Sequence, residues 1–160
     1  TASSKSRPKP TKPIWKKDPK GNQTDWTYAS HGGVLSEMQP APSSGAARPL
    51  KLATYTQRYA YIKNSGGTLV IAASPIWMPA TETQCQTATG SGVNTPVCDS
   101  GAPQMVTTYE YGAISTAESL LVKGIAVTAD SQTLRTCYSY DNQGRKISET
   151  KPNANSVSCP

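Results

Sequence analysis

The chain has 160 residues, a length that fits one domain and excludes a large multidomain enzyme. Its formal net charge is +6, from 16 Lys and Arg against 10 Asp and Glu. The whole excess lies in the first 20 residues, because nine basic and nine acidic residues balance from Gly21 onward. A nucleic-acid-binding domain needs a basic face on its fold, so this charge pattern argues against that class.

The N-terminal segment 1–17 is predicted to be a basic arm or linker. Residues 1–13 alternate Pro and Lys with almost no apolar side chain, so they cannot bury a face and are expected to be extended or polyproline-like. One interpretation is a solvated linker, and the other is an arm that docks on an acidic surface such as a neighbouring subunit. The cations of this arm are Lys5, Arg7, Lys9, Lys12, Lys16 and Lys17.

Residues 18–160 are predicted to form an all-β domain, an irregular array of antiparallel hairpins with long loops. Phe is absent, whereas Tyr, Trp, Thr and Ser are frequent, which favours strands with polar-tipped aromatic faces over a Leu-rich helical core. Aromatic residues recur at positions i and i+2, which point to the same face of a strand. These pairs are Trp26 with Tyr28, Tyr59 with Tyr61, Tyr109 with Tyr111, and Tyr138 with Tyr140.

The alternation continues beside two of the pairs, which is a strand signal. It places Tyr55, Gln57, Tyr59 and Tyr61 on one face, and likewise Leu134, Thr136, Tyr138 and Tyr140. Further strands are expected over 34–38, 68–73, 120–130 and 146–150. Gly- and Asn-rich turns between the runs, at 31–33, 64–67, 90–92 and 141–144, predict hairpins. A short helical turn is expected only over 115–121.

Four cysteines allow three disulfide pairings, and none forms the C-x-x-C pair typical of a zinc or redox site. We favour Cys85 with Cys98, because both lie in one Thr-, Gly-, Ser- and Asn-rich segment that resembles a long hairpin loop. Cys137 with Cys159 is the complementary pair. The alternative is four unpaired thiols in a cytosolic fragment.

One segment carries a motif that can be interpreted physically. It begins Tyr138-Ser-Tyr140-Asp141 and continues through Gly144-Arg145 to a strand and Pro152. Asp141 can accept hydrogen bonds from the backbone N–H groups of the turn, Gly144 suits the left-handed position, and Arg145 opens the return strand. The segment resembles the Tyr-Asp (YD) repeat of Rhs-type proteins, whose pattern is Y-x-Y-D-x-x-G-R.

Weaker copies of the motif precede it. Asp18-Pro-Lys-Gly21, followed by Trp26-Thr-Tyr28, resembles a unit whose D-x-x-G turn is intact. The next unit has Ala29 in place of the Asp. Tyr109-Glu-Tyr111-Gly112 lacks both Asp and Arg. Together these copies extend the resemblance over most of 18–160.

The resemblance implies strands that spiral into a hollow β-shell, which encloses a toxic domain in bacterial secreted toxins. Related repeats occur on cell-surface proteins. The chain lacks the family's shell-closing, self-cleaving segment, so neither protease nor toxin activity is implied. We expect a short piece of this architecture, or a small protein that uses the same strand unit differently, secreted or on a bacterial cell surface.

No catalytic constellation is recognisable, and we expect a non-enzymatic protein without metal or cofactor. His31 is the only histidine, and it has no Cys, Asp or Glu at metal-ligand spacing. Asp141 and Glu149 could be imagined as an acid/base pair. However, the turn explains Asp141, and Glu149 is expected on an exposed strand face. The most apolar stretch, 69–80, is too short and too interrupted by Pro to span a membrane.

The sequence therefore favours a structural module that builds a shell or a polymeric surface assembly by strand pairing. Open sheet edges need a cover, and the partner is expected to be a second copy or flanking repeats of a larger chain, with the arm docking on a neighbour. The alternative is a module that binds a carbohydrate or a cell-surface receptor through exposed aromatic strips. Its candidate residues are Trp15, Trp26 and Trp77.

Overall fold

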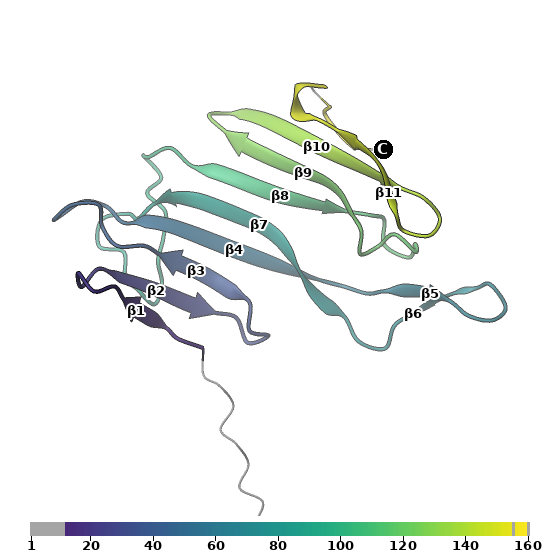
Figure 1. Ribbon diagram of the computed structural model, residues 1–160, viewed down its shortest axis with the longest axis horizontal. Helices are drawn as coiled ribbons and strands as arrows, with labels where there is room; N and C mark the ends of the chain where they lie inside the picture. Colours follow the sequence, from purple (N-terminus) through teal and green to yellow (C-terminus); the bar gives the residue numbers. More distant parts are fainter. Residues whose placement is uncertain (1–11, 155, 160) are drawn as a thin grey trace, which may run out of the picture.

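The computed structural model describes residues 12–154 and 156–159. The described chain is all-β, and its main element is one nine-stranded antiparallel sheet in the order β1-β2-β3-β4-β7-β8-β9-β10-β11 (Figure 1). Apart from one insertion, each strand pairs with the next strand in sequence. The strands are β1 (Trp15–Lys17), β2 (Gln23–Tyr28), β3 (Val34–Met38), β4 (Pro49–Arg58), β7 (Ile76–Gln86), β8 (Met105–Tyr111), β9 (Val122–Ala129), β10 (Gln132–Tyr140) and β11 (Lys146–Thr150).

The insertion is a two-stranded hairpin of β5 (Tyr61–Lys63) and β6 (Leu69–Ile71), which projects from the main sheet between β4 and β7 (Figure 1). Strands β4 and β7 still pair along their whole length, from Pro49 opposite Gln86 to Arg58 opposite Ile76. The hairpin is therefore an extension of an already continuous sheet.

Most strand predictions agree with the structure. The strands over 34–38 and 146–150 have the expected bounds, and β6 and β9 lie within the predicted segments 68–73 and 120–130. The pair Tyr59 and Tyr61 is wrong as a strand pair, because β4 ends at Arg58 and Tyr61 begins β5. The helical turn over 115–121 is also wrong. That segment is a series of turns held by short-range bonds, such as Leu121 N–H to the Glu118 carbonyl at 2.8 Å.

The register separates the side chains into two faces, because residues directly opposite each other point the same way. One continuous row runs across β2, β3, β4 and β7, and we call its side of the sheet the disulfide face. The next row, which begins with Trp26 opposite Glu37, lies on the other side, which we call the tyrosine face. The disulfide-face row is Asp25, Met38, Leu50 and Cys85.

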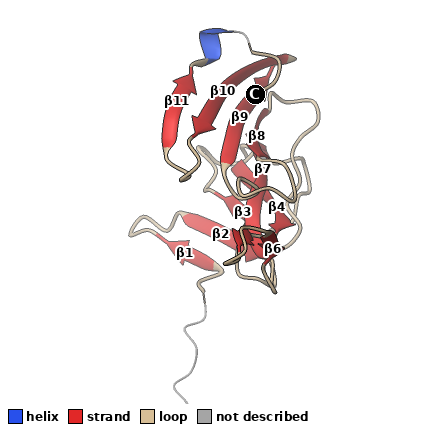
Figure 2. Cartoon of the chain, turned by 90° about the vertical axis from the view of Figure 1, so that its right-hand side faces the viewer, coloured by secondary structure: helices blue, strands red, loops and turns tan. Residues whose placement is uncertain are grey.

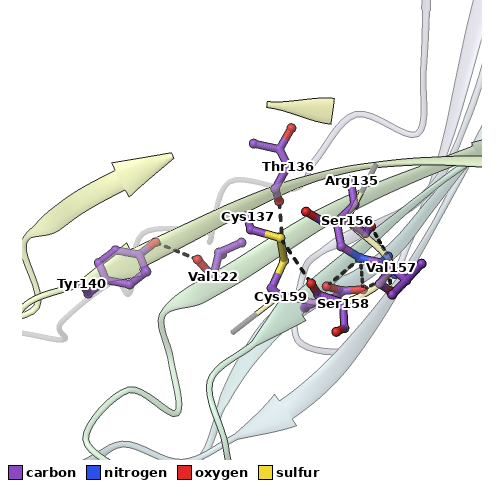
Figure 3. The surroundings of a disulfide bond; sticks show 10 residues. Val122, Arg135, Thr136, Cys137, Tyr140, Ser156, Val157, Ser158 and Cys159 are labelled. Carbon is purple, nitrogen blue, oxygen red and sulfur yellow. Dashed lines mark hydrogen bonds and ion pairs between the residues drawn. A yellow bond between two sulfur atoms is a disulfide. The ribbon is translucent and has the colours of Figure 1, made fainter. Parts of the chain in front are cut away.

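Both predicted disulfides are present and bring two irregular segments onto the disulfide face. Cys98 pairs with Cys85 and packs against the small core of Met38 and Leu50. Cys159 pairs with Cys137 and returns the C-terminal segment across β10 (Figure 3). The described cysteines include no free thiol.

An arginine makes a network of hydrogen bonds near each disulfide. Arg48 makes a 2.7 Å ion pair with the buried Asp25 and donates to the carbonyls of Gln23, Met38 and Gln39, which ties β2 to β3. Arg135 pairs with Glu110 at 2.9 Å and donates to the carbonyls of Ser156 and Val157, as Figure 3 shows for the last two. The C-terminal segment is thus held by charge-assisted bonds as well as by a disulfide, whereas the Arg48 bonds join β2 to β3.

The sheet has a very small core. Among the described residues, only Met38, Leu50, Cys85, Ala126 and Cys137 are buried hydrophobic side chains. Figure 2, turned by 90°, shows no second sheet facing the first, and the helical content of the described chain is the single 3₁₀ turn Pro152–Ala154. Many apolar side chains consequently remain exposed. No helix in the described part of the chain is long and apolar enough to span a membrane.

We predict that the disulfides supply an unusually large share of the stability. Replacing Cys137 and Cys159 together by Ala should cost about 3 kcal/mol, because the bridge closes a loop of 22 residues in the unfolded chain. Urea unfolding under non-reducing conditions measures this cost. The Cys85→Ala, Cys98→Ala double variant is the matched comparison, with a separation of 13 and a similar expected loss. An unchanged urea midpoint in both variants would contradict the prediction.

Candidate functional site

Three tight turns, two in the main sheet and one in the β5–β6 hairpin, share one design. Each is a three-residue loop that ends in a glycine with positive φ and is capped by the side chain of the residue before it. They begin at Asp18, Asn64 and Asp141. In each, a side-chain oxygen of the first residue accepts hydrogen bonds from two backbone N–H groups, at distances from 2.9 to 3.0 Å. The glycines have φ between +76° and +85° and are Gly21, Gly67 and Gly144.

A fourth turn has the same backbone without the side-chain cap. The Gly32 N–H donates to the Ala29 carbonyl, and the Ala29 N–H donates to the Gly33 carbonyl, both at 2.8 Å. Gly32 has φ of +91°. The position of Ala29 in the sequence pattern therefore corresponds to a real turn whose capping oxygen is missing.

Four tyrosines on alternate strands donate their hydroxyls to backbone carbonyls of the preceding strand. We call this series the tyrosine ladder. Its bonds are 2.7 to 3.0 Å long. The donors and acceptors are Tyr28 of β2 to Pro13, Tyr55 of β4 to Val34, Tyr111 of β8 to Pro79, and Tyr140 of β10 to Val122.

The ladder coincides with irregularities in the strand pairing. In β2, β4, β8 and β10 the register with the following strand shifts at the ladder tyrosine itself. Such β-bulges disrupt the regular backbone bonding. Across the bulge, Tyr28 lies opposite Val34, and the Val34 carbonyl accepts the hydroxyl of Tyr55. Tyr55 and Pro79, and Tyr111 and Val122, repeat this relation. Each link therefore leads to the next.

The register of all four links is identical. When the register of each strand pair is continued by two residues, the acceptor falls opposite the residue before the tyrosine. For β1 and β2, the pair Trp15 with Asp25 continues to Pro13 with Thr27, next to Tyr28. The same continuation from the pairs 36 with 52, 81 with 108 and 124 with 137 gives Val34, Pro79 and Val122.

Burial suits the Tyr111 hydroxyl for its role as a donor. Desolvation is the main cause that raises the pKa of Tyr111 above its usual range, so this hydroxyl stays protonated. The Arg58 guanidinium lies 5.1 Å from the centre of the Tyr111 ring and donates to the carbonyls of Ser119 and Gly112. Gly112 has no room for a side chain, because a Cβ there would lie 2.2 Å from the Glu118 carbonyl oxygen.

The predicted aromatic pairs include only part of the tyrosine ladder. Trp26 with Tyr28, Tyr109 with Tyr111, and Tyr138 with Tyr140 each share a strand on the tyrosine face, and the second member of each pair is a ladder tyrosine. Tyr55 is predicted on a strand face but belongs to no aromatic pair, although its hydroxyl makes the second link. A spacing near 28 residues was the available signal, since the two outer steps are 27 and 29 residues and the central step is 56.

The predicted repeat turn residues Asp141, Gly144 and Arg145 lie together as expected. The Arg145 Nε donates to Asp141 Oδ2 at 2.7 Å. Hydrogen bonds from the Arg145 backbone and then from its guanidinium lower the pKa of Asp141. At the first turn, Asn22 takes the place of this arginine, since its Nδ2 donates to Asp18 Oδ2 at 2.7 Å and lowers the pKa of Asp18.

The remaining titratable candidates do not form a catalytic group in the described residues. Glu149 lies between Lys146 and Lys151, whose side-chain hydrogen bonds lower its pKa to about 2. His31 stacks on Trp77 with ring centres 4.4 Å apart and meets the edge of Tyr55. No group of three or more potential metal-binding side chains occurs within 12–154 and 156–159.

The three tryptophans occupy separate places. Trp15 lies opposite Asp25 on the disulfide face, whereas Trp26 lies on the tyrosine face. Trp77 is on β7, stacked on His31. Of the predicted arm, Lys5, Arg7 and Lys9 lie outside the described residues, Lys12 lies 5.2 Å from the centre of the Tyr28 ring, and Lys16 and Lys17 belong to β1.

Comparisons with known proteins gave no match to a family model, to a curated protein or to a solved structure.

We predict that the ladder hydroxyls stabilise the sheet. Replacing Tyr111 by Phe should lower the free energy of unfolding by about 1 kcal/mol, because the ring is kept and one hydrogen bond to the Pro79 carbonyl is lost. Tyr59→Phe is the matched control, since Tyr59 lies outside the ladder and is 36% exposed. Equal urea midpoints for the two variants would contradict the prediction.

We also predict a pH effect on the last hairpin. The folded-state pKa of Glu149 is about 2 against an ordinary value of 4.5, so its stabilising contribution is complete above pH 4.5 and is lost as the pH falls towards 2. An NMR titration of the Glu149 carboxyl should show this low midpoint, and Lys146→Gln should raise it. Lys63→Gln, in the separate β5–β6 hairpin, should leave it unchanged.

Proposed function

We propose that this chain is a non-enzymatic, extracellular structural module of YD-repeat type, which builds a β-shell or a polymeric surface assembly by strand pairing. The observation that carries the proposal is the tyrosine ladder, a strand-to-strand link repeated in one register across an open sheet. A link of this kind can be extended by adding strands. It involves no convergence of groups around a substrate.

The turn chemistry supports the YD-repeat assignment. Tyr140 is followed directly by the Asp141–Gly144 turn, and Tyr28 is followed by the same backbone turn with Ala29 in the first position. A tyrosine that ends a strand and an Asp that caps the next turn are the two residues after which the repeat is named. Here both have a defined structural role.

The single-layer sheet supports assembly. Strands β1 and β11 each have one neighbour, so each leaves one edge of backbone groups without a strand partner in the described chain. Every residue of both strands is exposed. Unpaired edges of this kind are suited to strand addition from a second chain or from further repeats.

The two disulfides support an extracellular location, because oxidising compartments allow such bridges to persist. Glycan binding, the alternative, receives less support. Trp15, Trp26 and Trp77 lie on different faces or distant strands, so they offer no continuous strip on which sugar rings could stack.

The proposal predicts concentration-dependent self-association of the purified chain. Light scattering after size-exclusion chromatography should show species larger than 17.0 kDa, and removal of residues 1–13 should change their size or their midpoint concentration if the arm docks on a neighbour. A chain that remains monomeric at every concentration would contradict self-assembly. Glycan-array binding by that monomer, lost on Trp26→Ala without loss of fold, would favour the alternative.

A further inference from the structure

The two edge strands are of the same type. Strands that carry a ladder tyrosine (β2, β4, β8 and β10) alternate with strands that carry none, and the sheet both begins and ends with a strand of the second kind. The acceptor carbonyls belong to β3, β7, β9 and, for Tyr28, to Pro13 just before β1. Lys146 of β11 lies opposite Tyr140 across the last bulge, which is the place that Val34, Pro79 and Val122 hold earlier. The next tyrosine in the series should therefore donate to the Lys146 carbonyl.

Direct pairing of β11 with β1 of another copy would not supply that tyrosine. It would place two strands without a ladder tyrosine side by side and interrupt the ladder at every junction between molecules. The residues of β1 are Trp, Lys and Lys. A junction that keeps the ladder needs a tyrosine-bearing strand next to β11, and the one nearest to a sheet edge at the N-terminal side is β2, covered only by β1.

We propose that β11 of one copy replaces β1 of a second copy, so that the ladder continues from molecule to molecule. The Tyr28 hydroxyl then donates to the Lys146 carbonyl of the other copy in place of the Pro13 carbonyl. This inference rests on the proposed self-assembly and specifies its junction. The repeating unit of the polymer would be the eight strands from β2 to β11 that belong to the main sheet.

The two segments match residue by residue when Lys146 takes the place of Pro13. Ile147 then falls where Ile14 lies, opposite Trp26, whose N–H donates to the Ile14 carbonyl at 2.9 Å. Both isoleucines are 65% exposed in the single chain. The side chain opposite Trp26 would thus remain an isoleucine after the exchange.

The residues after Ile147 would point to the same face of the sheet as the β1 residues that they replace. Ser148 would lie opposite Asp25, and Thr150 opposite Gln23. Thr150 already lies opposite Cys137 on the disulfide face of its own sheet, which is the face of Asp25. The exchange therefore joins two sheets with their disulfide faces on the same side.

Strand β1 has the properties of a removable cap. It has three residues, all exposed, against five in β11. Lys16 and Lys17 give it the charged, short character that protects sheet edges from unwanted pairing. Its replacement would put Glu149 opposite Thr24 in place of Lys16.

The test uses the full chain with β1 weakened. Lys16→Pro removes a backbone donor from this three-residue strand and should lower the midpoint concentration of self-association about tenfold, measured by sedimentation velocity. Adding Ile147→Asp should reverse that gain, because a carboxylate would face Trp26 of the next copy. Ile62→Asp is the matched control, since Ile62 is 64% exposed on the inserted hairpin and should have no effect.

A peptide measurement does not depend on polymer formation. A fluorescein-labelled peptide of residues 145–151 should bind the Lys16→Pro chain, and the same peptide with the Ile147→Asp change should bind at least about tenfold more weakly. Circular dichroism and intact disulfides establish that the variants are folded. Absence of peptide binding to a folded Lys16→Pro chain would overturn the exchange.

The outcomes separate the two proposals. If the chains assemble but Ile147→Asp has no effect, the junction is elsewhere and the strand exchange is overturned while self-assembly stands. If every folded variant stays monomeric and binds no peptide, self-assembly and exchange both fail. If Lys16→Pro strengthens association and the added Ile147→Asp change abolishes that gain, the result supports the exchange.

Discussion

The bond from a tyrosine hydroxyl to the carbonyl of the preceding strand is the interaction on which the sheet depends. A β-bulge interrupts the regular exchange of backbone hydrogen bonds, and a carbonyl left without a partner costs free energy. In this chain, Val34, Pro79 and Val122 stand at such bulges, and a hydroxyl from the next tyrosine-bearing strand reaches each of them. Each of these bulges therefore lies beside a tyrosine hydroxyl that satisfies a backbone carbonyl there. Each ladder tyrosine thus satisfies a carbonyl of the strand before its own.

A single layer cannot rely on a central hydrophobic core. Its stability must come mostly from contacts between adjacent strands. The buried side chains that do exist gather beside the two disulfides, where Cys98 and Cys159 bring irregular chain onto one face. Arg48 and Arg135 bind backbone carbonyls at these same two places. Disulfides and partly buried ion pairs thus substitute for the packing that a second layer would provide.

Sequence patterns predicted the class, both disulfides and the last turn, because these depend on local chemistry: period-2 aromatics, loop composition and the Asp141–Gly144 pattern. They failed where a feature depends on distant chain. Tyr55 was predicted on a strand but not as an equivalent of Tyr28 and Tyr140, because β4 continues past it to Arg58 and no turn follows it directly. The turn at Asp130 and Ser131 was also missed, since both adopt positive φ, 49° and 62°, without a glycine. Tyr59 and Tyr61 have the right spacing, but the chain leaves the sheet between them.

The β5–β6 hairpin shows where this architecture tolerates change. Strands β4 and β7 are neighbours with ten paired positions, and the ladder passes from Tyr55 to Pro79 between them. The hairpin begins only after this pairing is complete, at the point where other strand pairs have a tight turn. The pairing of β4 with β7 therefore does not include the hairpin, whose base contacts Ser115 and Ser119 through Tyr61 and Tyr59. Loops at this end can diverge, acquire recognition surfaces or carry an inserted peptide tag while the spacing of the strands stays constant.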